Sequence, residues 1–148
     1  MGSTHARRYY HFVWGTKERR NFIQPEFEPR LHAWLGGAVR QIDGVADIIN
    51  GMPDHVHLLL SLRPKHSPAE IARNIKAGSS EWMHRELRVP AFGWQDGYFV
   101  CTISPIQLGG VRRYIGNQKE HHRKLTWEEE LKQLLTRAGI EYDPKYLT

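Results

Sequence analysis

Apolar positions change their spacing several times along the chain, and each spacing predicts a type of element. Aromatic and β-branched residues crowd 8–17 and predict a first strand. Apolar runs at 45–53 and 54–62 predict two more strands, joined by a short turn that favours a hairpin, and a fourth is expected within 93–104. Helical spacing predicts helices over 24–42, 67–87, 105–125 and 126–139, with an irregular tail at 140–148.

Local signals mark where these helices begin and end. Pro25 suits an early helical position, although Pro29 makes the start of that helix ambiguous. Ser67 is expected to cap the helix over 67–87, and Thr126 to cap the helix over 126–139. Gly139 is a typical helix stop.

The element order is β-α-β-β-α-β with two later helices. It predicts an α+β fold, ferredoxin-like or RRM-like, with an antiparallel sheet and helices on one face, plus a late tyrosine-bearing helix and a C-terminal helix. The 148 residues fit a single domain, with a core over about 8–125 and the C-terminal helix and tail at 126–148. Many proteins that bind single-stranded nucleic acid use this arrangement, but a fold alone does not define a function.

Composition and charge narrow the class of protein. Hydrophobic residues make up 40% and charged residues 25%, as in globular domains. The net charge of +5 and the pI of about 9.5 favour acidic partners, nucleic acid first, although many basic proteins bind nothing anionic. Cys101 is the single cysteine, which excludes an internal disulfide and fits a reducing compartment. No apolar run is long enough to span a membrane, and the N-terminus lacks a signal peptide, so we expect a cytoplasmic protein.

Two histidines stand at the head of the apolar run over 54–62. Side chains alternate along a strand, so His55 and His57 share one face and Val56 points to the other. Two neighbouring imidazoles can bind one divalent cation. For the H-x-H pattern taken alone, a pair of hydrogen-bonded structural histidines is the favoured explanation, because short motifs produce many false matches.

A second group of polar residues lies on the helix predicted over 105–125. Tyr114 and Gln118 are four residues apart and are expected to share a face, with His121 about one turn further on. A phenol with a pKa near 10 is a poor nucleophile at neutral pH, and a divalent cation on the scissile phosphate would offset this. Three groups would then bind the cation, namely His55, His57 and the side-chain oxygen of Gln118. The alternative is an amphipathic helix whose tyrosine packs on the sheet.

Basic residues cluster near both groups. Such residues supply sequence-independent affinity for nucleic acid that falls with salt concentration. The expected DNA-binding residues are Arg7, Arg8, Lys17, Arg19, Lys76, Arg112, Arg113 and His121.

Together these segments resemble the single-tyrosine HUH transposases of bacterial insertion sequences and their REP-associated domesticated relatives. An H-x-H strand followed by a helix with Y-x-x-x-Q, in this order, is specific to that family, whereas either half alone is not. The similarity runs from about residue 9 to about residue 124. The matching segments are HFVWGTK (11–17), GMPDHVHLLLSL (51–62), IKAGSS (75–80), WQDGYFVCTIS (94–104) and VRRYIGNQKEHHRK (111–124).

The resemblance implies a mechanism and a substrate. His55 and His57 would bind Mg²⁺ or Mn²⁺, with Gln118 as the third ligand. Tyr114 would attack single-stranded DNA near an imperfect hairpin, forming a 5′-phosphotyrosine bond and a free 3′-hydroxyl that later rejoins the strands. Insertion-sequence members are typically dimers, so a homodimer is expected, whereas domesticated relatives are often monomers.

Other functions stay open at this point. An RRM-like single-stranded nucleic-acid-binding module without catalysis would keep the fold and lose the chemistry, but the ligands and the tyrosine are all present. A zinc hydrolase would use His55 and His57 and attack with water, so it would not need Tyr114. A domesticated relative that processes REP hairpins would share the whole site.

Overall fold

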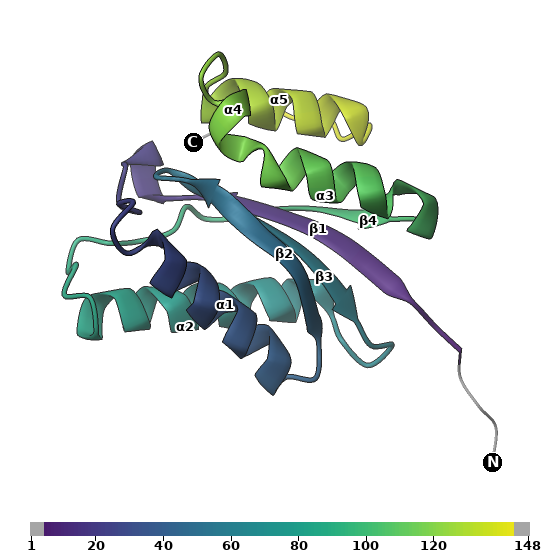
Figure 1. The fold of residues 1–148 in the computed structure, drawn as a ribbon, viewed down its shortest axis with the longest axis horizontal. Coiled ribbons are helices and arrows are strands. Elements are labelled where there is room, and N and C mark those ends of the chain that lie inside the picture. The colour runs from purple at the N-terminus through teal and green to yellow at the C-terminus, as the bar shows by residue number, and fades with distance from the viewer. Residues whose placement is uncertain (1–4, 144–148) are drawn as a thin grey trace.

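The structure, a computed structural model, describes residues 5–143 and is built on a four-stranded antiparallel sheet (Figure 1). The strands are β1 (Arg8–Gly15), β2 (Val45–Met52), β3 (His55–Leu62) and β4 (Phe99–Ile103). They lie in the order β2-β3-β1-β4, with β3 and β1 inside. This order follows from two split β-α-β units, so the predicted ferredoxin-like α+β fold is confirmed.

The hairpin between β2 and β3 sets the register of the histidine strand. Gly51 pairs with Val56, and Met52 pairs with His55. A Cβ atom on Gly51 would collide with the backbone carbonyl oxygen of His55, so this close approach of two backbones requires glycine. The predicted hairpin is confirmed, and it places His55 at the first position of β3.

The fourth strand lies within 93–104, as predicted, and occupies the second half of that range. It begins at Phe99, and Trp94 instead makes an isolated bridge with Thr16 at the end of β1. Gly97 lies between these points with a φ of +80°, which is incompatible with an extended strand. Residues 93–98 therefore form a loop that returns to the end of β1.

Helices α1 (Glu28–Gln41) and α2 (Pro68–Arg85) cover one face of the sheet (Figure 1). Helix α1 starts later than the predicted range 24–42, with Pro29 rather than Pro25 in its first turn. Ser67 caps α2 as predicted, because its hydroxyl oxygen accepts from the backbone N–H of Glu70. The main apolar core lies between these helices and the sheet and includes Phe12, Trp14, Leu35, Val56, Leu58, Leu60 and Met83.

The opposite face of the sheet is covered by α3 (Leu108–Gly116), α4 (Gln118–His121) and α5 (Trp127–Arg137) (Figure 1). Residues 5–143 also contain two short 3-10 turns, η1 (Lys17–Arg19) and η2 (Pro105–Gln107). The prediction of one helix over 105–125 is wrong, because the helix breaks at Asn117 directly after Gly116. The side-chain amide of Asn50, on β2, donates to the Ile115 carbonyl oxygen at 2.9 Å and caps the end of α3.

Helix α5 closes this second face with an apolar stripe. Its residues Trp127, Leu131, Leu134 and Leu135 pack with Val13 and Phe99 of the sheet. Thr126 caps the helix by accepting from the backbone N–H of Glu129, and Gly139 follows its end with a φ of +68°, both as predicted. Residues 140–143 have no regular structure, as expected, and the remainder of the predicted tail, 144–148, lies outside the described residues.

Candidate active site

The two predicted metal ligands lie side by side on β3, beneath helices α3 to α5. His55 and His57 are both fully buried, and Val56 between them packs into the core on the opposite face. The alternation expected from the sequence is therefore confirmed. The indole of Trp127 stacks on the His55 ring with centroids 4.3 Å apart, so α5 covers this histidine directly.

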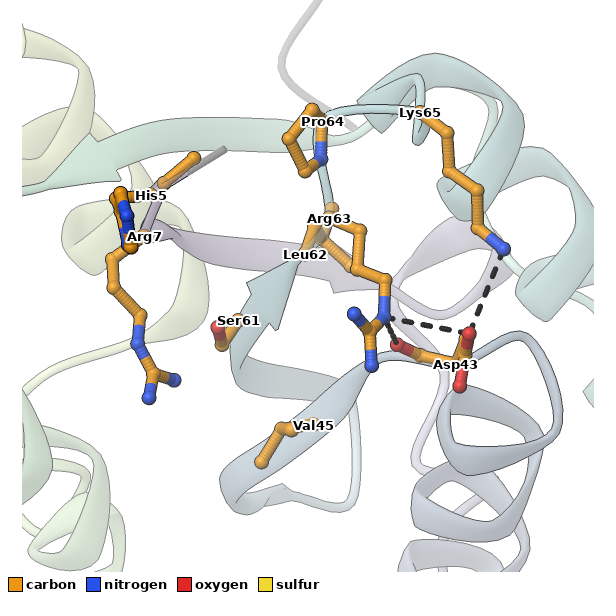
Figure 2. Close-up of a pocket in the computed structure, with 10 residues that line it drawn as sticks. His5, Arg7, Asp43, Val45, Ser61, Leu62, Arg63, Pro64 and Lys65 are labelled. Atoms are coloured by element: carbon orange, nitrogen blue, oxygen red, sulfur yellow. Dashed lines mark hydrogen bonds and ion pairs between the residues drawn. The ribbon is translucent and has the colours of Figure 1, made fainter. Parts of the chain in front are cut away.

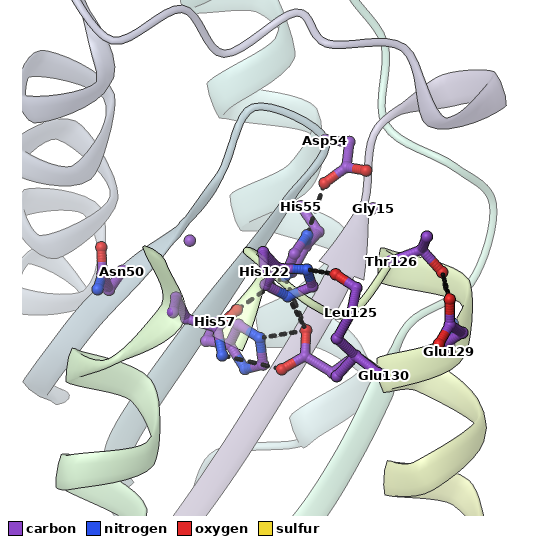
Figure 3. Close-up of polar contacts among 12 residues, drawn as sticks. Gly15, Asn50, Asp54, His55, His57, His122, Leu125, Thr126, Glu129 and Glu130 are labelled. Carbon is purple, nitrogen blue, oxygen red and sulfur yellow. Dashed lines mark hydrogen bonds and ion pairs between the residues drawn. The ribbon is translucent and has the colours of Figure 1, made fainter. Parts of the chain in front are cut away.

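A buried carboxylate from α5 occupies the middle of the site. Oxygen Oε1 of Glu130 lies 2.9 Å from His55 Nε2, 3.3 Å from His57 Nε2 and 2.8 Å from His122 Nε2 (Figure 3). Oxygen Oε2 accepts from the Gln118 side-chain amide at 2.8 Å and from the Tyr114 hydroxyl. Glu130 thus joins the histidines, the amide and the tyrosine into one hydrogen-bonded cluster.

The surroundings of His55 favour its charged form. Its Nδ1 lies 2.7 Å from the Asp54 carboxylate, while its Nε2 faces Glu130 and the Gln118 Oε1 atom at 2.9 Å. A ring that donates from both nitrogens is an imidazolium. Burial by itself disfavours that charge, but the hydrogen bonds to Asp54 and Glu130 outweigh burial and raise the pKa of His55 to about 9.

His57 and His11 are held in the neutral form. His11 was not singled out by the sequence; its Nε2 lies 2.8 Å from His57 Nδ1 in the interior of the sheet face. Burial lowers the pKa of His57 to about 4 despite its hydrogen bond to Glu130. Burial, followed by the neighbouring His57, lowers the pKa of His11 to about 3. A neutral His57 that donates from Nε2 to Glu130 accepts at Nδ1 from His11.

The pKa values of the Glu130 carboxylate and of the Tyr114 phenol are shifted in opposite directions. Burial disfavours the Glu130 carboxylate, yet hydrogen bonds from His122, His55 and His57 hold its pKa well below the usual range. Burial, and then the negative charge of Glu130, raise the pKa of Tyr114. The tyrosine is therefore a neutral hydrogen-bond donor in the structure.

Tyr114 and Gln118 reach the cluster from different helices. Tyr114 lies on α3, and its ring centroid is 5.7 Å from that of His57. Gln118 is the first residue of α4 and is fully buried. The expected continuous helix does not exist, but the break at Asn117 still leaves both side chains in contact with Glu130. His121 lies against the Tyr114 ring, with centroids 4.8 Å apart.

The donor atoms are close enough together to hold a divalent cation. His55, His122 and Glu130 each offer one atom, and these atoms all lie within 4.8 Å of one another. The predicted ligands His57 and Gln118 border the same point through their contacts with Glu130 and His55. Imidazole nitrogens with carboxylate and amide oxygens form a donor set that suits a divalent metal.

Sequence reasoning missed Glu130 and His122. Glu130 interrupts the apolar stripe formed by Trp127, Leu131 and Leu134, at the i+3 position from Trp127. An acidic residue at a core position was the available signal, but it stood within an acidic run that resembles an ordinary helix start. His122 lies just after α4, four residues beyond Gln118, so the spacing that groups Tyr114 with Gln118 was the available signal for it.

The predicted DNA-binding residues lie in several places. Arg8, Arg19, Lys76 and Arg112 all contact other groups of the protein. Arg8 donates to the Tyr10 hydroxyl and Arg19 pairs with Glu128, whereas Arg112 binds both oxygens of Asp47, at 2.8 and 2.6 Å.

Lys76 and Lys17 line a common pocket with Trp94 and Asp96. The Lys76 ammonium donates to the backbone oxygens of Gln95 and Gly97, and burial lowers its pKa. Arg113 is exposed on α3, whereas Arg7 is exposed just before β1, at the opposite end of that strand from Gly15. Among residues 5–143, no helix has the length and apolarity to cross a membrane.

The fold and the site together define an α+β protein with a ferredoxin-like sheet that carries a candidate metal centre on one face. A family model described as "Transposase IS200 like" matches residues 4–118, which is most of the chain. The chain therefore belongs to the IS200-like transposase family, a family of DNA-processing enzymes.

Individual relatives agree with this membership. The ISDra2 transposase TnpA of Deinococcus radiodurans is 27% identical over 117 residues, covering 75% of this chain and 84% of that protein. A solved structure described as a transposase of Deinococcus radiodurans has a TM-score of 0.62 and 26% identity, covering 80% of this chain and 96% of the other. A REP-associated tyrosine transposase bound to a REP hairpin has a TM-score of 0.55 at 14% identity, covering 75% and 64%, and supports the fold alone.

Proposed function

We propose that this transposase cleaves and rejoins single-stranded DNA with Tyr114 as the nucleophile. The observation that carries the proposal is the convergence on Glu130 of a tyrosine hydroxyl, the Gln118 amide and the paired histidines His55 and His57. Family membership supplies DNA as the substrate. An RRM-like binding module would need the sheet but not this buried polar cluster.

The reaction exchanges one phosphodiester linkage for another. The Tyr114 hydroxyl oxygen attacks the scissile phosphorus, a bond forms between them, and the bond from phosphorus to the 3′ oxygen breaks. The phenol loses a proton and the departing 3′ oxygen gains one, so a 5′-phosphotyrosine and a free 3′-hydroxyl result. The reverse attack by a 3′-hydroxyl rejoins the strands without ATP, because the linkage energy is retained.

The centre has a donor set that suits Mg²⁺ or Mn²⁺. His55, His57 and Gln118 are the proposed ligands, and His122 and Glu130 stand at the same point. A bound divalent cation supplies Lewis acidity that polarises and orients a phosphate oxygen. Glu130 holds the Tyr114 hydroxyl near the centre. Helices α3 to α5 cover the buried side chains of the centre and restrict access of water.

The DNA substrate is proposed to carry a hairpin near the cleavage site, by analogy with the REP-associated transposase whose structure holds a REP hairpin. Arg7, Lys17 and Arg113 are exposed cations placed to contact phosphates, and Arg8, Arg19, Lys76, Arg112 and His121 complete the proposed DNA-binding set. A homodimer is proposed as the assembled form.

The first test is covalent trapping of the protein on labelled DNA. Wild-type protein, hairpin-rich single-stranded DNA pools and Mn²⁺ should yield a labelled band at protein size on a denaturing gel. Tyr114→Phe should bind the same DNA and yield no band, because it lacks the attacking oxygen. Tyr142→Phe is the matched control, since this exposed tyrosine lies outside the cluster. A Tyr114→Phe protein that still forms the adduct would exclude Tyr114 as the nucleophile.

A further inference from the structure

Glu130 is an unusual residue for its position in the fold. It lies on α5 beside the apolar residues Trp127 and Leu131 and is fully buried. A buried carboxylate is costly unless hydrogen bonds and opposite charge compensate it. A simple packing role at this helix position would be filled better by an apolar side chain. The compensation present here comes entirely from groups of the candidate active site.

The two oxygens of Glu130 serve different partners. Oε1 faces the Nε2 atoms of His55, His57 and His122 (Figure 3). Oε2 faces the Tyr114 hydroxyl and the Gln118 amide. The carboxylate therefore stands between the nucleophile on one side and the imidazoles on the other.

We propose that Glu130 is the positioning residue of this centre: it holds the Tyr114 hydroxyl beside His55 and His57 and contributes, with His55 and His122, to binding the divalent cation. The inference rests on the proposed function. Helix α5, which follows the segment matched by the family model, becomes part of the catalytic centre.

The experiment compares substitutions of Glu130 with a substitution of its exposed neighbour Glu129. Glu130→Gln should bind Mn²⁺ about 10- to 100-fold more weakly, as measured by calorimetry without DNA, and form the tyrosine adduct more slowly. Glu130→Asp should recover part of the Mn²⁺ affinity. Glu129→Gln should match wild type in both assays, because Glu129 is exposed and a glutamine can still accept from Thr126. Wild-type Mn²⁺ affinity and adduct rate in Glu130→Gln would overturn the inference, while Tyr114→Phe tests the proposed function separately.

A separate cavity lies at the other end of the sheet. It has a volume of about 950 Å³ and is formed by the segment before β1, the start of β2 and the loop after β3 (Figure 2). Among residues 5–143, the charged groups that line it are the cations of Arg7, Arg63 and Lys65 and the carboxylate of Asp43. Exposed Val45 adds an apolar surface. Excess positive charge beside an apolar patch suits a nucleic-acid backbone and its bases.

Hydrogen bonds hold the walls of this cavity in place. The Arg63 backbone N–H donates to His66 Nδ1 at 2.9 Å, and His66 Nε2 donates to the Ile42 carbonyl oxygen at 2.7 Å. Arg8 donates to the Arg63 carbonyl oxygen at 2.9 Å. Asp43 Oδ2 lies 3.4 Å from Arg63 Nε and 3.6 Å from Lys65 Nζ. The loop that carries Arg63 and Lys65 is therefore bonded to the loop that carries Asp43.

The cavity is remote from the tyrosine. Strand β3 begins at His55 in the centre and ends at Leu62, which lines the cavity. Seven residue steps of about 3.3 Å separate them by roughly 23 Å. We infer that this cavity binds DNA phosphates that flank the cleavage site at this distance, as an anchor separate from the active site.

Salt-dependent DNA binding tests the anchor. Arg63→Ala/Lys65→Ala should reduce the slope of log affinity against log salt by about 1.4 on single-stranded DNA, roughly 0.7 for each lost phosphate contact. The matched control is Arg73→Ala/Arg85→Ala, which removes the same charge from α2 and should leave the slope near wild type. A slope equal in the two double variants would exclude the anchor. Such a result would leave Tyr114 chemistry untouched, which covalent trapping measures independently.

Discussion

At the scale of single residues, the candidate site is a cluster of buried polar groups that compensate one another. Glu130 carries a negative charge in the interior, and His55, with Asp54 behind it, carries the nearest positive charge. His57 and His11 stay neutral because burial penalises two further positive charges at this distance. This balance explains how ionisable side chains occupy a sheet face that is otherwise apolar.

The neutral histidines predict how metal-free protein responds to acid. His11 and His57 have pKa values of about 3 and about 4 in the fold, against about 6.5 when unfolded. Below pH 6.5 these two histidines bind protons in the unfolded chain but stay neutral in the folded chain. The free energy of unfolding therefore falls as the pH decreases from about 6.5 towards 4. Each histidine contributes up to about 1.4 kcal/mol per pH unit. Urea unfolding of EDTA-treated protein at several pH values measures the slope.

Two variants check the origin of that slope. His11→Asn keeps a donor for His57 and should reduce the slope by about one proton, whereas His5→Asn, at an exposed position, should not change it. His55 works in the opposite sense: its raised pKa stabilises the fold at low pH, and this contribution is lost between about pH 6.5 and 9. Stability that stays constant from pH 6.5 to 4 in wild type would contradict the neutral pair.

At the scale of elements, the break between α3 and α4 decides where the tyrosine and the glutamine lie. A continuous helix would place Tyr114 and Gln118 one turn apart on a single stripe. Instead α3 ends at Gly116, and α4 starts anew with Gln118 buried against His55. Asn50 on β2 stabilises this break, because its amide donates to the carbonyl oxygens of Ile115 and Gly116.

Asn50→Ala should therefore destabilise the end of α3, the helix that carries Tyr114. Loss of a cap typically costs about 1 kcal/mol, and carbonyl groups at the end of α3 would lose their partner. We expect the free energy of unfolding to fall by about that amount in urea titrations, together with a slower rate of covalent adduct formation. Asn74→Ala, at an exposed position of α2, should have neither effect. Unchanged stability and adduct rate in Asn50→Ala would show that the break is held by other contacts.

At the scale of the whole molecule, the two faces of the sheet have different tasks. Helices α1 and α2 cover the larger apolar core, which holds the sheet in shape. Helices α3, α4 and α5 cover the other face, where two smaller apolar clusters surround the polar centre. The centre therefore joins β3, α3, α4 and α5 with the segment that carries His122. A ligand bound there would couple segments that are far apart in sequence.

Metal binding should accordingly stabilise the folded chain as a whole. At a free Mn²⁺ concentration one hundred times the dissociation constant, binding to the folded state alone adds about 2.7 kcal/mol. We expect the midpoint of thermal unfolding to rise with Mn²⁺, to fall back with EDTA, and to respond far less in His55→Ala. The measurement is differential scanning calorimetry on metal-free protein. A midpoint that does not respond to Mn²⁺ at saturating concentrations would argue against a metal centre at this place.

The sequence by itself determined the element order, the hairpin and the shared face of His55 and His57, because these follow from local periodicity and turn residues. It also placed Tyr114 and Gln118 near that face, although through a helix that is in fact broken. Only the tertiary structure brought Glu130 and His122 to the site. Glu130 is 75 positions beyond His55, and nothing local specifies which face of the sheet α5 covers. That face is selected because Trp127 and Leu131 pack against the sheet, and this packing places the Glu130 carboxylate in contact with the histidines.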